Sequence, residues 1–410
     1  MDIVRSKGED YVVDSNVALE FKLVRNEEDL EDDTVSFKPE MSHQIFGDSE
    51  SIFGYKDLKV KLYFTSAKLI TYLGLEYTKK IDPVKFDGVE PDNVLQLLGS
   101  KLPPNVLSNI DEFTQALNFE SDFLPFGELL HSFEVNQDSG KPQTFEIYFC
   151  DVSNKKFLNY HERLQTFILF YIDAASFIDV DDEKWCFFTV YEKFKNQNQK
   201  IVYAVAGYAT VYMYYAYPAN IRPRVSQMLI LPPFQKKGIG AQLLSTIYNH
   251  FIQQLDVLDI TVEDPNEEFQ QLRDYVDICY CQNLDCFSVD KLKNGFCIDM
   301  AKQLQKVRKI NKKQARRIYE IMRLKSTNIS NEKDFQEFRL DVKKRLNIPF
   351  QKEKSYAKKL ESLMDDPQYQ TSFGLNSTEH RLETLDKLFQ ETLEGYQKVL
   401  QRVSERPLQF

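Results

Sequence analysis

The spacing of apolar residues changes along the chain and divides it into three regions. Residues 1–140 contain short strand-like runs at 17–24 and 58–64, separated by turns rich in Pro, Asn and Asp. This pattern predicts a compact α+β module. Within it, the acidic run 27–33 is expected to be a solvated loop or helix face, and contact with a basic partner is the alternative.

Residues 141–290 alternate between strand-like and helical spacing. Runs of β-branched and aromatic residues predict strands at 144–150, 185–191, 202–217, 226–231 and 257–262. Helical spacing predicts a buried helix with Leu164, Phe167, Ile168, Tyr171, Ile172 and Ala175, a second with Leu244, Ile247, Tyr248 and Phe251, and a third over 266–278. This order predicts a mixed α/β core.

Residues 291–410 are charged and helical. The stretch 306–325 is strongly basic, which is typical of a solvated helix face; contact with an acidic partner or a nuclear signal are the alternatives. Apolar residues between Leu382 and Val403 follow a 3/4 spacing, which predicts a long helix. We expect that helix to pack on its own domain, with a coiled-coil surface for a partner as the alternative.

Composition narrows the class of protein. A chain of 410 residues with 42% hydrophobic residues is long enough for two or three domains with sizeable cores. The longest apolar stretch, 167–172, is far too short to span a bilayer, and the start of the chain lacks the apolar segment of a secretory signal, so we expect an intracellular protein without membrane contact. The six cysteines are expected to be reduced and mostly buried, because their spacing fits no common zinc site; no metal is expected.

The net charge of −10 argues against sequence-independent binding of nucleic acid. It suits a basic ligand, although an acidic balance that keeps the protein soluble explains it equally well.

The segment 226–244 is the most informative part of the sequence. An apolar strand stops at Pro232 and Pro233, and a loop with Gly238 and Gly240 then leads into the helix that carries Leu244. Such a loop can present unpaired backbone N–H groups to a phosphate, and the helix dipole adds partial positive charge. The spacing matches neither a Walker loop nor a dinucleotide loop. A plain tight turn is the alternative.

Gln235-Lys236-Lys237-Gly238-Ile239-Gly240 resembles the pyrophosphate loop of the GCN5-related N-acetyltransferases, which bind acetyl-coenzyme A. Longer strings at 43–47, 160–167, 177–185, 222–231 and 258–265 are similar to the catalytic subunit of type B histone acetyltransferase. The resemblance covers roughly residues 15–325. It implies a central acetyltransferase core at 141–290, between an N-terminal α+β domain at 1–140 and a C-terminal helical domain at 291–410.

The resemblance also implies how the coenzyme is bound. Backbone groups of Met228, Leu229 and Ile230 would bond the pantetheine arm of acetyl-CoA. The pyrophosphate would be held by Gln235, Lys236, Lys237, Gly238, Ile239, Gly240 and Ala241. Asn266 matches a further coenzyme contact. No acylated cysteine is needed, so the transfer is expected to be sequential.

A lysine amine is protonated at neutral pH and must lose a proton before it attacks a thioester, so a base is required. Glu263 and Asp264 follow the predicted strand 257–262, where mutual repulsion and partial burial would favour proton uptake. The alternative is that the pair starts the next helix. The resemblance implies that Glu263 is the base and that Asp264 assists. It also places a third carboxylate, Asp173, in the helix before 174–179; a simple buried polar residue is the alternative.

The peptide site is implied in two places. Trp185 and Tyr212 match residues that line a lysine channel, and the backbone of Tyr212, Met213 and Tyr214 would pair with the substrate tail; core packing is the alternative. Asp48, Ser49 and Glu50 match a second tail contact. Ser49 stands where an acidic residue can occur in the family, so one charge contact is expected to be missing.

The leading hypothesis is therefore an acetyl-CoA-dependent acetyltransferase that modifies lysines near the amino end of newly made histone four. By resemblance, its partner is a WD-repeat histone chaperone and it acts in the cytoplasm and nucleus. An acetyltransferase for a small amine or an α-amine is one alternative, and a catalytically silent histone-binding scaffold is another.

Overall fold

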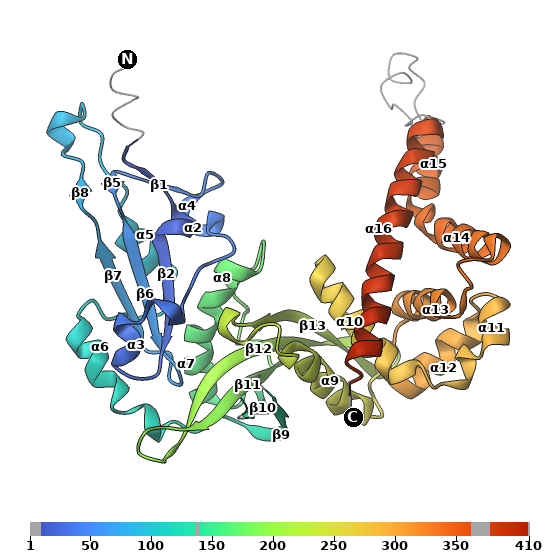
Figure 1. Ribbon diagram of the computed structural model, residues 1–410, viewed down its shortest axis with the longest axis horizontal. Coiled ribbons are helices and arrows are strands. Elements are labelled where there is room, and N and C mark those ends of the chain that lie inside the picture. Colours follow the sequence, from blue (N-terminus) through green and yellow to red (C-terminus); the bar gives the residue numbers. More distant parts are fainter. Residues whose placement is uncertain (1–9, 137–139, 141, 362–377, 409–410) are drawn as a thin grey trace. The chain divides into compact units, whose positions relative to one another are not determined.

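The computed structural model describes residues 10–136, 140, 142–361 and 378–408 (Figure 1). Its internal contacts divide the chain into two compact units, which are described separately. The first comprises Met1–Tyr215 and Pro223–His250, and the second comprises Ala216–Arg222 and Phe251–Phe410. The division into domains at 1–140, 141–290 and 291–410 stays a prediction.

The first unit begins with an α+β module built on a four-stranded sheet of order β3-β2-β6-β7. Strand β2 is buried along its whole length and pairs in parallel with β6. Its polar residues are satisfied internally, because Glu20 accepts a hydrogen bond from Tyr63 (2.5 Å) and Lys22 donates to the carbonyl oxygen of Leu30 (2.7 Å). The sheet consists of β2 (Leu19–Val24), β3 (Ser36–Phe37), β6 (Lys59–Thr65) and β7 (Thr71–Glu76). The strands predicted at 17–24 and 58–64 are confirmed.

Shorter elements complete the module. Its small strands form two ladders, β1 with β4 and β5 with β8. Their bounds are β1 (Val12–Asp14), β4 (Ser51–Phe53), β5 (Tyr55–Lys56) and β8 (Lys79–Lys80). The helices are α2 (Ser15–Ala18), α3 (Glu28–Glu31), α4 (His43–Phe46), α5 (Val94–Gly99) and α6 (Ile110–Leu117). No residue of α3 is buried, so the acidic run 27–33 has the solvent-facing character expected of it.

A second sheet of the same unit carries the candidate site. Its strands follow in the order β9-β10-β11-β12-β13, and the pairs β9–β10, β10–β11 and β11–β12 are antiparallel. The strands are β9 (Glu128–Val135), β10 (Gln143–Asp151), β11 (Trp185–Lys195), β12 (Ile201–Ala216) and β13 (Asn220–Ile230). The predicted strands at 144–150, 185–191, 202–217 and 226–231 are confirmed, and β13 starts earlier than predicted.

Helices α7 (Lys155–Leu164), α8 (Ile168–Tyr171) and α9 (Ile239–Ile252) belong to this part of the chain. The helix predicted after the glycine loop is confirmed as α9, with all four marker residues buried. Phe167 and Phe170 pack on the N-terminal module, with ring centroids 4.5 Å from Phe64 and 4.9 Å from Phe21 respectively. The aromatic contacts fix the position of the segment that follows α8.

Two predicted elements are shorter than expected. The helix expected to reach Ala175 ends at Tyr171, because Ile172 is extended and Ala174 has a positive φ of 53°. The strand expected at 257–262 keeps regular pairing only in β14 (Thr261–Val262), with single bridges at Val257 and Ile260. Both changes bear on candidate site residues.

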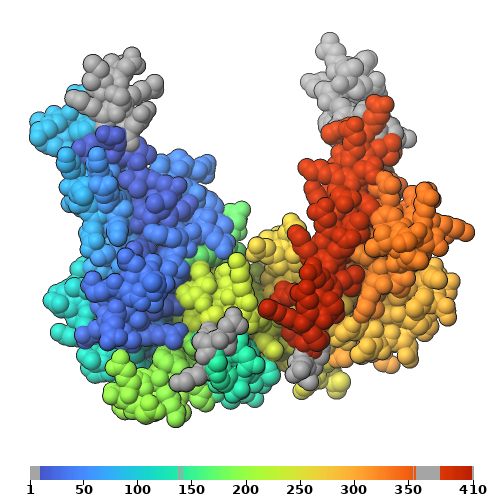
Figure 2. All heavy atoms as spheres, in the orientation of Figure 1, coloured from blue at the N-terminus to red at the C-terminus, as the bar shows by residue number. Residues whose placement is uncertain are grey.

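The second unit is largely helical. Its helices are α10 (Glu267–Cys281), α11 (Val289–Lys293), α12 (Ile298–Arg308), α13 (Lys312–Ser326), α14 (Glu332–Leu346), α15 (Ile348–Glu361) and α16 (Thr378–Glu405). Helix α16 packs against α10, α13 and α14, and Figure 2 shows it in red beside the orange helices of the same unit. The long predicted helix is thus packed on its own domain. Among the described residues, no helix has the length and apolar character needed to cross a membrane.

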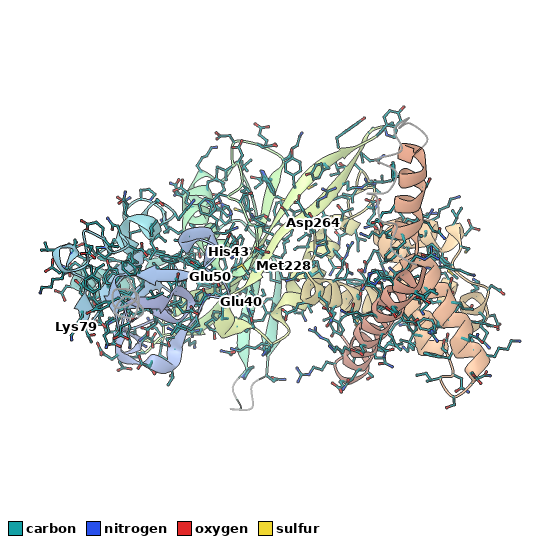
Figure 3. All side chains as sticks on the ribbon, turned by 90° about the horizontal axis from the view of Figure 1, so that it is seen from above. Glu40, His43, Glu50, Lys79, Met228 and Asp264 are labelled. Atoms are coloured by element: carbon teal, nitrogen blue, oxygen red, sulfur yellow. The ribbon has the colours of Figure 1, made fainter. Side chains whose placement is uncertain are left out.

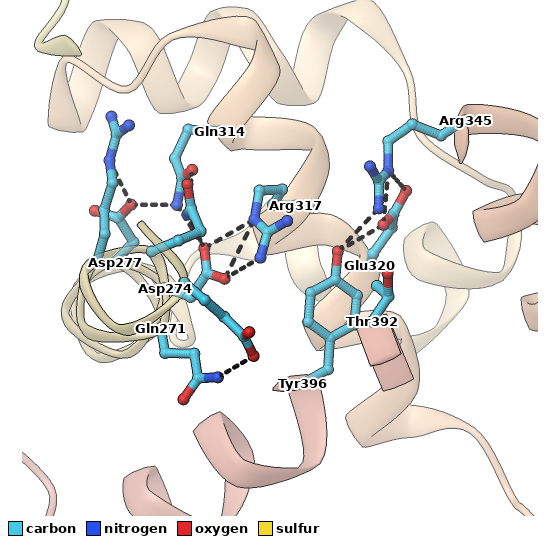
Figure 4. A network of polar contacts seen from close by, with 12 residues as sticks. Gln271, Asp274, Asp277, Gln314, Arg317, Glu320, Arg345, Thr392 and Tyr396 are labelled. Carbon is cyan, nitrogen blue, oxygen red and sulfur yellow. Dashed lines mark hydrogen bonds and ion pairs between the residues drawn. The ribbon is translucent and has the colours of Figure 1, made fainter. Parts of the chain in front are cut away.

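The basic stretch 306–325 forms the expected solvated face only in part: Lys306, Lys312, Lys313 and Lys325 are exposed, whereas two of its arginines pair with buried carboxylates. Arg317 forms an ion pair with buried Asp274 (2.6 Å), and Arg316 forms one with buried Glu320 (2.8 Å). Glu320 also accepts hydrogen bonds from Arg345 and Tyr396, so one carboxylate joins α13, α14 and α16 (Figure 4). Each of these buried carboxylates therefore has a cation beside it, which a buried charge requires.

All six cysteines are free thiols, and five of them are buried. No group of three or more His, Cys, Asp and Glu side chains suited to a metal ion occurs in the part of the chain that the structure describes.

His161 gives the first unit a built-in sensitivity to acid. Its ring is fully buried, 4.7 Å from Phe187 and 5.9 Å from Tyr208 between centroids, and neither ring nitrogen has a hydrogen-bond partner among the described residues. Burial lowers the pKa of His161 to about 3. The folded state therefore keeps the ring neutral at a pH where the unfolded chain takes up a proton.

We expect the free energy of unfolding to fall by about 1.4 kcal/mol for each pH unit below the ordinary value of 6.5. His161→Phe should remove this slope, because phenylalanine takes up no proton. Thermal unfolding of the two proteins between pH 7 and pH 5, with exposed His380→Phe as the control, measures it. A stability difference between His161→Phe and the unchanged protein that stays constant with pH would contradict the assignment.

Candidate functional site

The loop between β13 and α9 is shaped as an anion-binding turn. Gln235 donates from its side-chain amide to the carbonyl oxygen of Ile230 (2.9 Å), which folds the loop back on the end of β13. Lys236 and Gly238 both have positive φ angles, 61° and 84°. The N–H groups of Ala241 and Gln242 donate to the Gly238 carbonyl oxygen at 3.1 and 3.2 Å, so helix α9 starts directly after this glycine.

This geometry leaves a run of backbone donors available. Among the described residues, the N–H groups from Lys236 to Gly240 donate to no oxygen. Successive amides in a turn with left-handed residues form a concave nest, and the positive end of the α9 dipole lies at the same place. A diphosphate is the kind of ligand that such a nest accommodates. The prediction that Gln235 to Ala241 form a phosphate loop is consistent with this arrangement.

The two lysines of the loop differ in environment. Lys236 is exposed, whereas Lys237 is half-buried, with its ammonium 5.5 Å from the centroid of Phe234 and 3.4 Å from the side-chain oxygen of Gln143. Burial lowers the pKa of Lys237, and the carboxylate of Glu192 opposes that shift. Of the two ammonium groups, that of Lys237 is therefore the one held beside the loop by contacts with neighbouring side chains.

Gly207 on β12 lies against two of the predicted coenzyme contacts, and the sequence analysis missed it. A Cβ atom at Gly207 would lie 2.4 Å from the carbonyl oxygen of Leu229 and 2.9 Å from Cα of Ile230. The pairing of β11 with β12 shifts between Val190 and Tyr191, next to this glycine. Only glycine fits there, because the backbone carrying Leu229 and Ile230 lies directly against it. The sequence signal was an isolated glycine inside a strand pattern.

Trp185 and Tyr212 lie opposite each other on β11 and β12, with ring centroids 4.9 Å apart. Tyr214 lies 4.5 Å from Tyr212 and is 37% exposed. Trp185 and Tyr212 are half-buried, so the alternative of core packing does not describe them. The three rings form an aromatic surface at the end of the sheet, where an aliphatic stem with a terminal cation can lie against them.

Asp182 is a second residue that the sequence analysis did not assign to the site. The hydroxyl of Tyr212 donates to its carboxylate at 2.7 Å. This hydrogen bond raises the pKa of Tyr212 and lowers the pKa of Asp182. The backbone N–H of Met213 donates to the carbonyl oxygen of Lys184 (3.0 Å), so this amide already has an acceptor. Tail pairing along 212–214 stays a prediction.

Asp48, Ser49 and Glu50 lie in one turn after α4 but are used differently. Glu50 accepts hydrogen bonds from the backbone N–H groups of Ser42 (2.6 Å) and His43 (3.0 Å) and from the side chain of Asn16 (2.8 Å). The bond from Ser42 is the main reason that the pKa of Glu50 is lowered. Asp48 and Ser49 are exposed, so Asp48 is the carboxylate of this turn that faces solvent.

Asp173 does not lie in a helix, nor is it a buried polar residue; both expectations are wrong. It follows the end of α8 in a turn, with its side chain 77% exposed. Its Oδ1 lies 3.2 Å from Nε2 of His43, which the sequence analysis had not included in the site. Figure 3 labels His43 and Glu50, which contact each other from α4 and the turn after it.

Glu263 and Asp264 belong to the second unit and follow β14. Their strand is anchored there by the N–H of Ile260, which donates to the carbonyl oxygen of Lys309 (2.7 Å), and by Lys309, which donates from Nζ to the carbonyl oxygen of Val257 (2.6 Å). Both carboxylates are exposed, so the expected partial burial is wrong for the chain alone.

Helix α10, which follows Glu263 and Asp264, is capped by a different residue. Asn266 is the N-cap residue of α10, and its side chain accepts a hydrogen bond from the N–H of Phe269 (2.8 Å). The alternative that Glu263 and Asp264 start this helix is therefore unnecessary, since Asn266 does so. The predicted coenzyme contact of Asn266 would have to be made alongside this capping bond.

The chain was compared with known protein families and structures. A family model described as the N-terminus of histone acetyl transferase HAT1 matches residues 11–173. A model of the acetyltransferase (GNAT) family matches residues 149–272, and a model of the C-terminal part of the histone acetyltransferase type B catalytic subunit matches residues 273–324.

Among curated relatives, the histone acetyltransferase type B catalytic subunits of Rattus norvegicus and Homo sapiens are each 44% identical over 403 residues, which is 98% of this chain and 96% of theirs. A Dictyostelium discoideum protein of the same description is 33% identical over 338 residues, covering 79% of this chain and 70% of its own. A solved aminoglycoside acetyltransferase from a soil metagenomic sample has 16% identity and a TM-score of 0.23, covering 32% of this chain and 83% of its own.

The ionised state of Glu50 should order the segment 42–50. Because its pKa is lowered from the ordinary 4.5, its contribution is present above that pH and is lost as the pH falls through the lowered value. Glu50→Gln should increase hydrogen exchange at the amides of Ser42 and His43 several-fold at pH 7, with Asp48→Asn as the matched control. Equal protection in both variants would show that the carboxylate does not hold this segment.

Proposed function

The chain belongs to the family of type B histone acetyltransferase catalytic subunits, and we propose that it acetylates lysine side chains near the amino end of newly made histone four. It is an acyltransferase that uses acetyl-CoA, with a central acetyltransferase fold in an α+β chain. The expected family and fold class are thereby confirmed. The choice of histone four and the roles of individual residues are the proposal.

The nest at 236–240 is the observation that carries the proposal. Its free N–H groups and the half-buried cation of Lys237 match the two negative charges of a coenzyme pyrophosphate. The coenzyme supplies an activated acetyl thioester. Met228, Leu229 and Ile230 precede the loop on β13, which would let their backbone groups bond an extended pantetheine arm as an additional strand does.

The acetyl transfer needs a neutral amine, a nearby base and a donor for the negative charge that develops on the thioester oxygen. We assign proton removal to Glu263, with support from Asp264 and Asp173, and the donor role to a backbone N–H of β13. Glu263 is exposed in the chain alone, so in this proposal the bound substrates shield its carboxylate from water. The aromatic surface of Trp185, Tyr212 and Tyr214 would hold the lysine stem.

The basic tail of a histone fits the exposed acidic side chains of the first unit. Asp48 and Asp173 are exposed, and Asp182 is held next to the Tyr212 ring. A small amine would need neither the N-terminal module nor the helical unit, which favours a protein substrate. A silent scaffold would need neither a loop with five unpaired backbone donors nor a carboxylate at Glu263.

Two further parts of the proposal rest on family resemblance. We place the enzyme in the cytoplasm and nucleus, where newly made histones pass. We also propose a WD-repeat histone chaperone as its partner. Co-purification of a propeller protein with the tagged chain, and the distribution of the tagged chain between the two compartments, test these points.

Gly238→Ala should weaken acetyl-CoA binding by about tenfold or more, because a Cβ would intrude where the pyrophosphate meets the nest. No protein atom lies within 4 Å of that Cβ, so the loss would reflect the ligand and the left-handed backbone. Gly88→Ala is a matched control, since Gly88 has a φ of 83° and equally open surroundings. Isothermal titration with coenzyme A measures both, and unchanged affinity in Gly238→Ala would refute the phosphate loop.

Glu263→Gln keeps the size of the side chain but cannot accept a proton. If Glu263 is the base, kcat should fall by about 100-fold or more while coenzyme affinity barely changes. The loss should shrink at high pH, where more of the substrate amine is already neutral. Asp264→Asn should cost less. Steady-state rates with a histone tail peptide from pH 7 to pH 10 test this, and a loss that is uniform with pH would place the base elsewhere.

A further inference from the structure

The turn that carries Asp173 is held from two sides. Gln44 of α4 donates from its side-chain amide to the carbonyl oxygen of Ala175 (3.2 Å), and Gln227 of β13 donates to the carbonyl oxygen of Ser176 (2.8 Å). Ala174, between Asp173 and these two residues, has a positive φ of 53°, which a non-glycine residue adopts only when its surroundings enforce it. The backbone next to Asp173 is thus fixed both to the N-terminal module and to the strand that precedes the loop.

Among the residues that the structure describes, the side chain of Asp173 has one polar partner, the ring of His43. Nε2 of that ring lies 3.2 Å from Oδ1 of Asp173, and Nδ1 lies 3.7 Å from Oε1 of Glu50. The ring stands between two carboxylates that are far apart in the sequence and come from different elements. Because 77% of the Asp173 side chain is exposed, packing does not fix its rotamer, and the ring nitrogen is the group that can do so.

The position of the ring is itself determined by Glu50. The Glu50 carboxylate accepts the backbone N–H of His43 at 3.0 Å and that of Ser42 at 2.6 Å. Asn16 donates to the second carboxylate oxygen at 2.8 Å. A chain of contacts therefore runs from Asn16 through Glu50 and His43 to Asp173, all within the first unit.

We propose that His43 is a positioning residue of the acetyl transfer, which holds the Asp173 carboxylate in one orientation toward the substrate amine. The inference rests on the proposed function, because it takes Asp173 as a carboxylate that supports the reaction. His43 need not touch either substrate. Its contribution is to disfavour the Asp173 rotamers in which the carboxylate points into solvent.

The test uses two amide side chains of different length. In His43→Gln the amide nitrogen reaches about as far as Nε2 and can still donate to Asp173, whereas in His43→Asn it stops near Nδ1 and faces Glu50 only. Both variants keep a polar, uncharged group beside Glu50, which favours folding in each. We expect kcat with a histone tail peptide to fall about tenfold in His43→Asn and to be largely restored in His43→Gln. The KM for acetyl-CoA should change in neither.

Asp173→Asn and the double variant with His43→Asn separate the possible outcomes. If His43 acts through Asp173, the double variant should lose no more activity than Asp173→Asn alone. Losses that multiply, or a full rate in His43→Asn beside a slow Asp173→Asn, would overturn the positioning role and leave the proposed function standing. Absence of tail acetylation by the unchanged chain would instead remove the proposed function, and this inference with it.

Discussion

The candidate site of the first unit depends on two hydrogen bonds to one turn. Residues 172–184 contain no regular helix or strand, only local turns such as those at Asp179 and Asp182, so the placement of the segment on the rest of the unit needs a constraint from other elements. The side chains of Gln44 and Gln227 supply this constraint by donating to the carbonyl oxygens of Ala175 and Ser176. Gln227 lies on β13 directly before Met228. Its hydrogen bond to Ser176 therefore fixes the turn relative to the strand that leads into the coenzyme loop. The N-terminal module thus contributes Gln44 and His43 to the surroundings of Asp173.

Charge is distributed over the first unit in a way that suits two unlike substrates. The loop after β13 offers backbone donors, a helix N-terminus and Lys237, all of which favour a phosphate. The segments 48–50 and 173–182 offer exposed carboxylates, and Asp182 lies next to the Tyr212 ring, which favours a basic peptide. In each group some members are committed to internal hydrogen bonds, and these fix the geometry for the members that remain exposed. Glu50, for example, holds the turn in which the exposed Asp48 lies, through its bonds to Ser42, His43 and Asn16.

Much of the fold followed from local patterns in the sequence. Residue patterns predicted β2, β6, β10 to β13 and α9, since side chains with period 2 or 3.6 must face a core, whereas β3, β7 and β9 were not predicted. The glycine loop followed from residue types that permit positive φ. The sequence did not predict that His43 contacts Asp173, that Gly207 lies against β13, or that Glu50 is engaged in internal hydrogen bonds. Each of these depends on a contact between residues apart in the chain. For the same reason a basic stretch predicted to be solvated proved to contain Arg316 and Arg317 paired with buried carboxylates.

The central claim is that this chain transfers an acetyl group from acetyl-CoA to a lysine side chain of a histone tail. Tandem mass spectrometry of a histone four amino-terminal peptide, incubated with the purified chain and acetyl-CoA, tests it most directly. A second peptide with a blocked α-amine identifies the acceptor. The account predicts one added acetyl group on a lysine Nε of both peptides, and acetylation slower by about tenfold or more when the loop variant Gly238→Ala is used at limiting coenzyme. Acetylation confined to the α-amine, or no acetylation of either peptide, would contradict it.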